Sequence, residues 1–304
     1  MVKVVEGGYT EIEEDLDDWI EAGKIAAKCL DMGAKMIKPG SKFLDVANAV
    51  EDKIKDLGGF PAFPVNLSTN EIAAHYTPSR NDESTFSDQL VKIDVGVHVN
   101  GAIGDTARTV DLSGKWKDLV QASRDALNAA IKIIKDGTTL GEIGNAVQEA
   151  IKAKGFVPIA NLSGHSLERF SLHAGLNIPN VATGDETALE EGDIIAIEPF
   201  ATNGRGLIKE SSNPEIFKLV SDRGVRSPIA RNVLKEAKLF NELPFAKRWI
   251  QTKGAEFGIR EMMRANLLKE YTPLPEIDGG MISQAEHTVY VEKKGCMVLT
   301  ELED

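Results

Sequence analysis

The chain has 304 residues, 42% of them hydrophobic and 27% charged, which suffices for one large domain or two ordinary ones. Its net charge of −12 argues against binding of nucleic-acid phosphates as the main task, and we expect no specific nucleic-acid partner. Two cysteines, Cys29 and Cys296, are too few for a disulfide framework and fit a reducing compartment. No signal core is present, and no apolar run approaches the ~20 residues that span a bilayer. We therefore expect a soluble, cytoplasmic protein without a membrane partner.

The first third of the chain predicts two amphipathic helices. The sequence TEIE (10–13) matches a capping box, which predicts that a helix begins there. Apolar residues at helical spacing continue to Met36, and Pro39-Gly40 is expected to end this helix. Ser41 is expected to cap a second helix that continues to Gly58-Gly59.

Residues 91–110 predict a β-hairpin that carries two aspartates. Valine and isoleucine alternate with polar residues as in a strand with one buried face, and Asn100-Gly101 is typical of a type I′ turn. With this turn, Asp94 and Asp105 lie diagonally on one face, roughly 7–8 Å apart. Like charges so close repel unless a cation lies between them or one carboxylate takes up a proton. The alternative is an ordinary solvated face of an antiparallel sheet.

A second pair of helices, predicted at 116–135 and 138–153, repeats the first pair. Residues 37–55 align without gaps to residues 134–152, with 8 of 19 positions identical. The likeness continues, because FPVNLS after the first pair has a counterpart in PIANLS after the second. Two copies about 97 residues apart do not make a solenoid, which needs a shorter repeat and at least three copies.

The duplication predicts two similar halves, about 1–110 and 111–304, which face each other across a pseudo-twofold axis with a site between them. VKIDVG, which contains Asp94, corresponds to IIAIEP, which contains Glu198. A partner acid is then expected on the return strand of the second half. The alternating stretch SQAEHTVYVEKK supplies it as Glu286.

Residues 201–272 replace the short turn of the first half with an insertion. We expect three helices in it, at 232–243, 245–253 and 259–271. The insertion holds 14 Lys and Arg against 8 Asp and Glu, whereas the rest of the chain is strongly acidic. One interpretation is a helical cap with solvated basic faces, and the other is a docking surface for an anionic partner.

The predicted halves bring together side chains with oxygen and nitrogen donors and no thiolate. This set suits Mn²⁺, Fe²⁺, Co²⁺ or Zn²⁺, and two divalent ions would balance the four carboxylates. Two such ions about 3.5–4 Å apart share a water and lower its pKa, which indicates metal-assisted hydrolysis. The candidate ligands are Asp94, Asp105, His165, Glu198 and Glu286.

Four histidines lie outside this set of candidate ligands. His75 and His173 lie in polar or glycine-containing segments, where an imidazole can serve the substrate amide or an oxyanion. The alternative for both is a hydrogen-bonded loop histidine. His98 shares the face of Asp94 but lies near the turn, which favours a structural role. His287 alternates to the face opposite Glu286 and is expected to lie behind the ligands or in the core.

Five motifs resemble type II methionine aminopeptidases, the archaeal and eukaryotic class, over nearly all 304 residues. They are NEIAAHYTP, KIDVGVHVNGAIGDTA, NLSGHSLERFSLHAG, AIEPFATNGRG and QAEHT. The resemblance implies an α+β pita-bread fold, in which helices cover a curved antiparallel sheet within one catalytic domain, 1–304. It also implies that 201–272 is the helical insertion subdomain of the type II class.

The resemblance further implies how the ligands are shared between two divalent ions, which are Co²⁺, Mn²⁺, Fe²⁺ or Zn²⁺. Asp94 would chelate one ion, and Asp105 and Glu286 would bridge both. His165 and Glu198 would complete the second. A bridging hydroxide would then attack the carbonyl of an N-terminal methionine whose following residue is small.

For catalysis and substrate binding, the resemblance implies that Glu198 moves protons, His173 stabilises the carbonyl oxygen and His75 contacts the scissile amide. Phe63 and Tyr271 would line the methionine pocket. The implied substrates are methionyl peptides and nascent chains. Separately, we expect a monomer, and the basic charge of residues 201–272 makes a transient ribosome contact through this insertion a further expectation. One departure is Ala285, where relatives often carry a bulkier residue. Another is the absence of the long charged N-terminal extension of eukaryotic members.

Two alternatives remain. Prolidases and proline-specific aminopeptidases share the fold and ligands, but they usually carry an additional N-terminal domain and a different histidine-rich motif. A catalytically dead relative would act as a binding partner of ribosomes or nucleic acid. Such proteins lose metal ligands, whereas all five are present here.

Overall fold

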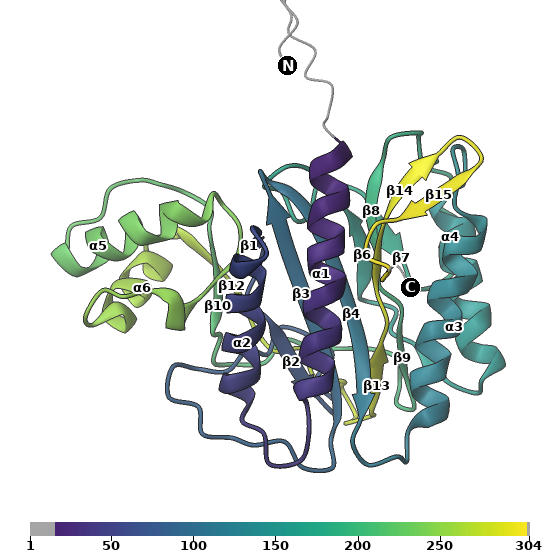
Figure 1. Cartoon of the computed structure of the whole chain (residues 1–304), viewed down its shortest axis with the longest axis horizontal. Helices are drawn as coiled ribbons and strands as arrows, with labels where there is room; N and C mark the ends of the chain where they lie inside the picture. Colours follow the sequence, from purple (N-terminus) through teal and green to yellow (C-terminus); the bar gives the residue numbers. More distant parts are fainter. Residues whose placement is uncertain (1–15, 303–304) are drawn as a thin grey trace, which may run out of the picture.

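The computed structural model describes residues 16–302 and shows an α+β protein, as the sequence predicts (Figure 1). The helices are α1 (Leu16–Met36), α2 (Phe43–Asp56), α3 (Lys117–Ile133), α4 (Leu140–Ala153), α5 (Pro228–Ala237) and α6 (Ala255–Arg264), with 3₁₀ turns η1 (Lys238–Phe240) and η2 (Lys247–Trp249). The strands are β1 (Phe60–Pro61), β2 (Asn66–Thr69), β3 (Leu90–Val99), β4 (Ala102–Asp111), β5 (Val157–Pro158), β6 (Ser163–Ser166), β7 (Asn177–Pro179), β8 (Ile194–Ile197), β9 (Phe200–Thr202), β10 (Ile216–Leu219), β11 (Phe245–Ala246), β12 (Leu268–Tyr271), β13 (Ile282–Gln284), β14 (His287–Glu292) and β15 (Gly295–Val298).

The two N-terminal helices pack together, with α1 against the long hairpin β3–β4 and α2 against β1 and β2 of the same sheet (Figure 1). The capping box predicted at 10–13 lies outside the described residues. The prediction that Ser41 caps the second helix is wrong, because α2 begins at Phe43 with Lys42 in the capping position. The Ser41 hydroxyl instead donates to the carbonyl of Met36 (3.0 Å), which satisfies an acceptor left open at the end of α1.

The predicted hairpin register is confirmed. Asp94 lies opposite Ala107 and Gly96 lies opposite Asp105, so both aspartates point to the same face of the sheet. The turn residue Asn100 has φ of 50°, and the glycine after it has φ of 92°, as a type I′ turn requires.

The second pair of helices is also confirmed as α3 and α4. The strands that follow each pair of helices form corresponding pairings in the two copies. α4 begins at a complete capping box, in which the side chains and backbone amides of Thr139 and Glu142 hydrogen-bond reciprocally. β2 pairs with β3 in the first copy, and β6 pairs with β8 in the second. β14 returns antiparallel to β8, so that Glu198 directly follows β8 and Glu286 directly precedes β14.

The insertion contains two of the three predicted helices, in shortened form, and a small sheet that the sequence did not predict. Its strands are ordered β11-β10-β12. The helix predicted at 245–253 is wrong, because Phe245 and Ala246 are fully buried and pair with β10. The helix predicted at 259–271 ends at Arg264, and the positive φ of Asn266 (53°) turns the chain into β12.

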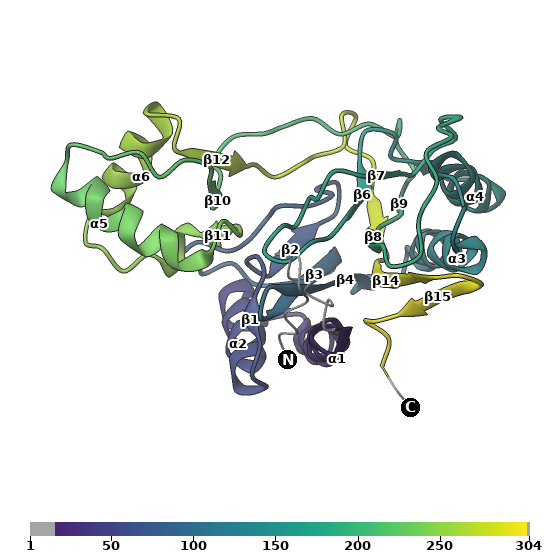
Figure 2. The same cartoon turned by 90° about the horizontal axis from the view of Figure 1, so that it is seen from above.

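The insertion lies at one side of the molecule. Viewed from above, α1 and α2 lie beneath β3 and β4, α3 and α4 lie at the opposite end from the insertion, and α5 and α6 form its outer edge (Figure 2). Separate groups of buried apolar side chains fill the space under α1–α2, under α3–α4 and inside the insertion. Within residues 16–302, every helix is too short or too polar to cross a membrane.

Candidate metal centre and its surroundings

Five strands or strand ends converge on one buried cluster of acids and a histidine, all of them expected from the sequence. Asp94 and Asp105 come from the hairpin, His165 from β6, Glu198 from the end of β8 and Glu286 from the start of β14. The Glu286 amide donates to the carbonyl of Ala107 on β4 (3.0 Å), which joins the two sheets beside the cluster.

The side chains lie within range of a common cation. One ligand atom from each of Asp105, His165 and Glu286 lies within 4.8 Å of the other two. The His165 Nε2 atom is 3.8 Å from Asp105 Oδ2 and 3.7 Å from Glu198 Oε1. Asp94 adjoins the same group, because its charge acts on the pKa of Asp105, Glu198 and Glu286.

Burial and mutual repulsion make this cluster unfavourable when all its acids are ionised. Burial raises the pKa of Asp94 to about 7. Burial, followed by the neighbouring carboxylates, raises the pKa of Asp105, Glu198 and Glu286 well above the ordinary range. Among the described residues, no lysine or arginine contributes to these pKa values. His165 supplies no positive charge either, because burial lowers its pKa to about 3.

The donor set fits a divalent metal. The Oδ1 atoms of Asp94 and Asp105 are buried and find no hydrogen-bond partner in the described part of the chain. Buried acceptors are nearly always satisfied, so these unpaired carboxylate oxygens are suited to hold a cation. Carboxylates and a neutral imidazole, without thiolate, suit Mn²⁺, Fe²⁺, Co²⁺ or Zn²⁺.

The other four predicted site residues border the cluster. The His173 ring lies 4.4 Å from the ring of His165, and the Tyr271 ring lies 5.3 Å from His75 and 6.5 Å from His173, between ring centroids. The Phe63 ring lies directly on the backbone of Gly96, where an added Cβ would be 2.1 Å from a ring carbon. Gly96 is the register partner of Asp105. The structure therefore places two imidazoles and two aromatic rings beside the acids.

The two remaining histidines lie where the sequence indicated. His98 packs its ring against Phe60 and Phe170, which is a structural environment. The His287 Nδ1 atom pairs with the Thr300 hydroxyl (2.8 Å), behind the strand that carries Glu286.

Gln284 is a site residue that sequence reasoning missed. Its Nε2 atom lies 3.5 Å from Glu198 Oε2 and 3.4 Å from Glu286 Oε2, and its side-chain oxygen is buried without a partner. Gln284 precedes Glu286 by two positions in an alternating strand, so the period-2 pattern could have placed it on the same face.

Comparison with known proteins agrees with this geometry. The model of metallopeptidase family M24 matches residues 18–292. A methionine aminopeptidase of Methanocaldococcus jannaschii is 46% identical over 291 residues, which cover 95% of this chain and 99% of the relative.

Two solved structures are similar over almost the whole chain. The crystal structure of a Thermotoga maritima methionine aminopeptidase has a TM-score of 0.71 at 25% identity, covering 99% of this chain and 100% of that one. A thermophilic Arx1 has a TM-score of 0.82 at 17% identity, covering 95% and 91% of the two chains. Both confirm the pita-bread fold. The family match spans the four acids and the one imidazole of the cluster and shows that the chain belongs to metallopeptidase family M24.

Proposed function

We propose that this chain is a metal-dependent methionine aminopeptidase, which removes the N-terminal methionine from peptides whose second residue is small. The observation that carries the proposal is the buried cluster of four carboxylates and a neutral imidazole, bordered by His75, His173, Phe63 and Tyr271. The relative from Methanocaldococcus jannaschii, which this chain matches over 99% of its length, bears this activity in its name.

The proposed ligands of two divalent ions are the five side chains of the cluster. Asp94 is assigned to one ion, Asp105 and Glu286 to both, and His165 with Glu198 to the other. When bound, such ions polarise a carbonyl and make water acidic enough to act as a nucleophile near neutral pH. The physiological metal follows from availability as well as from the ligands.

The protein's own groups supply proton transfer and orientation. Glu198 is assigned to carry a proton towards the leaving amine, because a carboxylate at the metal centre can accept a proton from the attacking water and pass it on. Partial burial of the His173 ring, together with nearby lysines, lowers its pKa to about 4, so it is a neutral donor for the carbonyl oxygen. Burial lowers the pKa of His75 to about 4 as well, which leaves a neutral imidazole for the scissile amide.

Phe63 and Tyr271 are assigned to the methionine pocket. Both side chains are buried, at 7% and 8% exposure, and they come from different elements, the segment before β2 and the end of β12. Aromatic walls suit a flexible thioether side chain, which packs favourably against rings. If the space beyond the scissile bond is narrow, only peptides with a small second residue fit.

The chain organisation and partners are part of the same proposal. We assign one catalytic domain built of halves at about 1–110 and 111–304, with 201–272 as an insertion, acting as a monomer in the cytoplasm. Peptides are the substrates, and nascent chains are the cellular source of N-terminal methionine. The excess of basic residues in the insertion supports transient contact with the anionic surface of a ribosome.

The test is reconstitution of activity from the metal-free protein. Cleavage of a Met-Ala-Ser peptide should appear on addition of Mn²⁺, Fe²⁺ or Co²⁺ to chelator-treated protein. Asp105→Asn and Glu286→Gln should each suppress it, because each removes a charge assigned to both ions. Turnover by the chelated protein, or full turnover by either variant, would overturn the proposal.

A further inference from the structure

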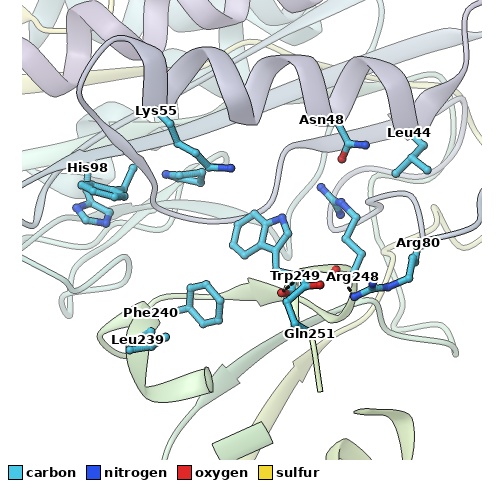
Figure 3. A pocket seen from close by; sticks show the side chains of 12 residues that line it. Leu44, Asn48, Lys55, Arg80, His98, Leu239, Phe240, Arg248, Trp249 and Gln251 are labelled. Atoms are coloured by element: carbon cyan, nitrogen blue, oxygen red, sulfur yellow. Dashed lines mark hydrogen bonds between the residues drawn. The ribbon is translucent and has the colours of Figure 1, made fainter. Parts of the chain in front are cut away.

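The insertion docks on the rest of the protein although it has a hydrophobic core of its own. Its buried apolar side chains, from β10 to β12, form a group separate from the one under α1 and α2. Between α2 and residues 239–251 a cleft of about 440 Å³ opens (Figure 3). The orientation of the insertion against α2 therefore depends on specific contacts at the edge of this cleft.

Those contacts are polar and buried. Glu51 on α2 and Arg248 in η2 are 3% and 7% exposed, and the Arg248 guanidinium donates to the Glu51 carboxylate. The indole of Trp249 donates to the second oxygen of Glu51 (2.8 Å). Arg80 adds a further tie, because its guanidinium donates to the carbonyls of Arg248 (2.8 Å) and Ile250 (2.6 Å). Figure 3 shows Arg248, Trp249 and Arg80 at this edge. We call the pair Glu51 and Arg248 the bridge.

On the body of the protein, the bridge holds the segments that carry Phe63 and His75. Glu51 accepts from the amide of Val65 (3.2 Å), two residues after Phe63. Arg248 donates to the Thr77 hydroxyl (2.8 Å), two residues after His75, and that hydroxyl donates to the carbonyl of Val65 (2.8 Å). One network thus fixes both segments.

Within the insertion, the strand pairings of the small sheet connect Arg248 to Tyr271. Arg248 lies two residues after the end of β11, and β11 pairs with β10 at Ile216 and Phe217. β10 in turn pairs with β12, where Ile216 faces Tyr271. A shift of Arg248 relative to α2 would therefore move Tyr271 relative to Phe63 and His75.

We propose that the bridge is a positioning element that sets the distance between the two walls of the methionine pocket. This inference rests on the proposed function. None of the bridge contacts includes a proposed metal ligand, so loosening the bridge widens the pocket and leaves the metal centre intact. Substrate binding should suffer more than the chemical step, because a misplaced pocket wall weakens ground-state and transition-state binding alike.

The experiment separates positioning from simple stability. Arg248→Met and Glu51→Met each leave a buried charge without its partner, which destabilises the fold, whereas the double variant removes both charges and should recover much of the melting temperature. We expect KM for Met-Ala-Ser to rise about 10-fold in Arg248→Met and in the double variant, with kcat changed by less than about 3-fold and two ions still bound. Arg260→Met is the matched control, because Arg260 makes an exposed ion pair with Glu256 on the same insertion.

Recovery of both melting temperature and KM in the double variant would overturn the inference, as would an unchanged KM in Arg248→Met. An inactive wild-type protein would instead refute the proposed function. Hydrogen exchange then still tests the bridge, because the amides of 63–77 and 268–271 should exchange faster in Arg248→Met than in Arg260→Met. Equal exchange in these two variants would overturn it.

Discussion

Removal of the metal should make the stability of the protein strongly dependent on pH. Without a cation, the carboxylates of Asp94, Asp105, Glu198 and Glu286 face each other in a buried site, and their pKa values are raised. The folded metal-free protein therefore holds protons that the unfolded chain releases near pH 4. Stability must fall as pH rises across this interval, since the folded state binds more protons than the unfolded state.

Asp94 gives the magnitude of this loss of folding stability. Its pKa rises from the ordinary value of 3.8 to about 7, and at about 1.4 kcal/mol per pH unit this corresponds to roughly 4 kcal/mol. The loss is absent below pH 4 and complete above pH 7. For a chain of this size it corresponds to a decrease of on the order of 5–10 °C in melting temperature.

The assay compares thermal unfolding of chelated and Mn²⁺-saturated protein between pH 5 and pH 8. We expect the two melting temperatures to diverge as pH rises, because bound ions keep the carboxylates ionised without penalty. Asp105→Asn should flatten the curve of the chelated protein and raise its melting temperature at pH 7.5, although it abolishes activity. Parallel curves for chelated and loaded protein would refute the reasoning, because the acids would then not repel one another in the folded state.

Three further substitutions follow from the structure. His75→Ala should slow turnover while two ions remain bound, and loss of metal measured by elemental analysis would show that His75 is a ligand. Gly96→Ala should displace the Phe63 ring, whose carbon would lie 2.1 Å from the new Cβ, and raise KM about 10-fold; an unchanged KM would separate Phe63 from the pocket. Gly101→Val places a β-branched residue at φ of 92° in the hairpin turn and should cost at least about 1 kcal/mol in urea unfolding, whereas equal stability would contradict the I′ assignment.

The hairpin could be predicted from sequence because its determinants are local. Asn100 and Gly101 select the turn type, and the turn fixes the register of every pair down to Asp94 and Ala107. The convergence of Glu198 and Glu286 on the hairpin followed from the internal duplication. The turn depends on residues that are neighbours in sequence, and the convergence of the acids depends on two segments of the chain that repeat each other.

The insertion could not be predicted in the same way, because distant contacts override its local pattern. FAKRWIQTK has helical spacing, yet Phe245 forms a strand that pairs with β10. Arg248 hydrogen-bonds Glu51, which lies 197 positions earlier in the chain. Nothing near Arg248 in the sequence indicates that partner. The Ser41 error has a different, local origin, since the acceptor of its hydroxyl is the carbonyl of Met36 at the end of the preceding helix, five residues earlier.

Hydrogen bonds between the strands hold the backbone that carries the four acids together. Buried threonine hydroxyls join β4 to β13 and β14 around the cluster: Thr106 donates to the carbonyl of Glu286 (2.8 Å), Thr109 to that of Gln284 (2.7 Å) and Thr288 to that of Asp105 (2.8 Å). Separation of the carboxylates would leave these groups buried and unpaired, at about 1–3 kcal/mol each. Repulsion is therefore relieved by proton uptake or by cations. A site held in this way would be preformed for divalent ions, whose positive charge would relieve the repulsion between the carboxylates.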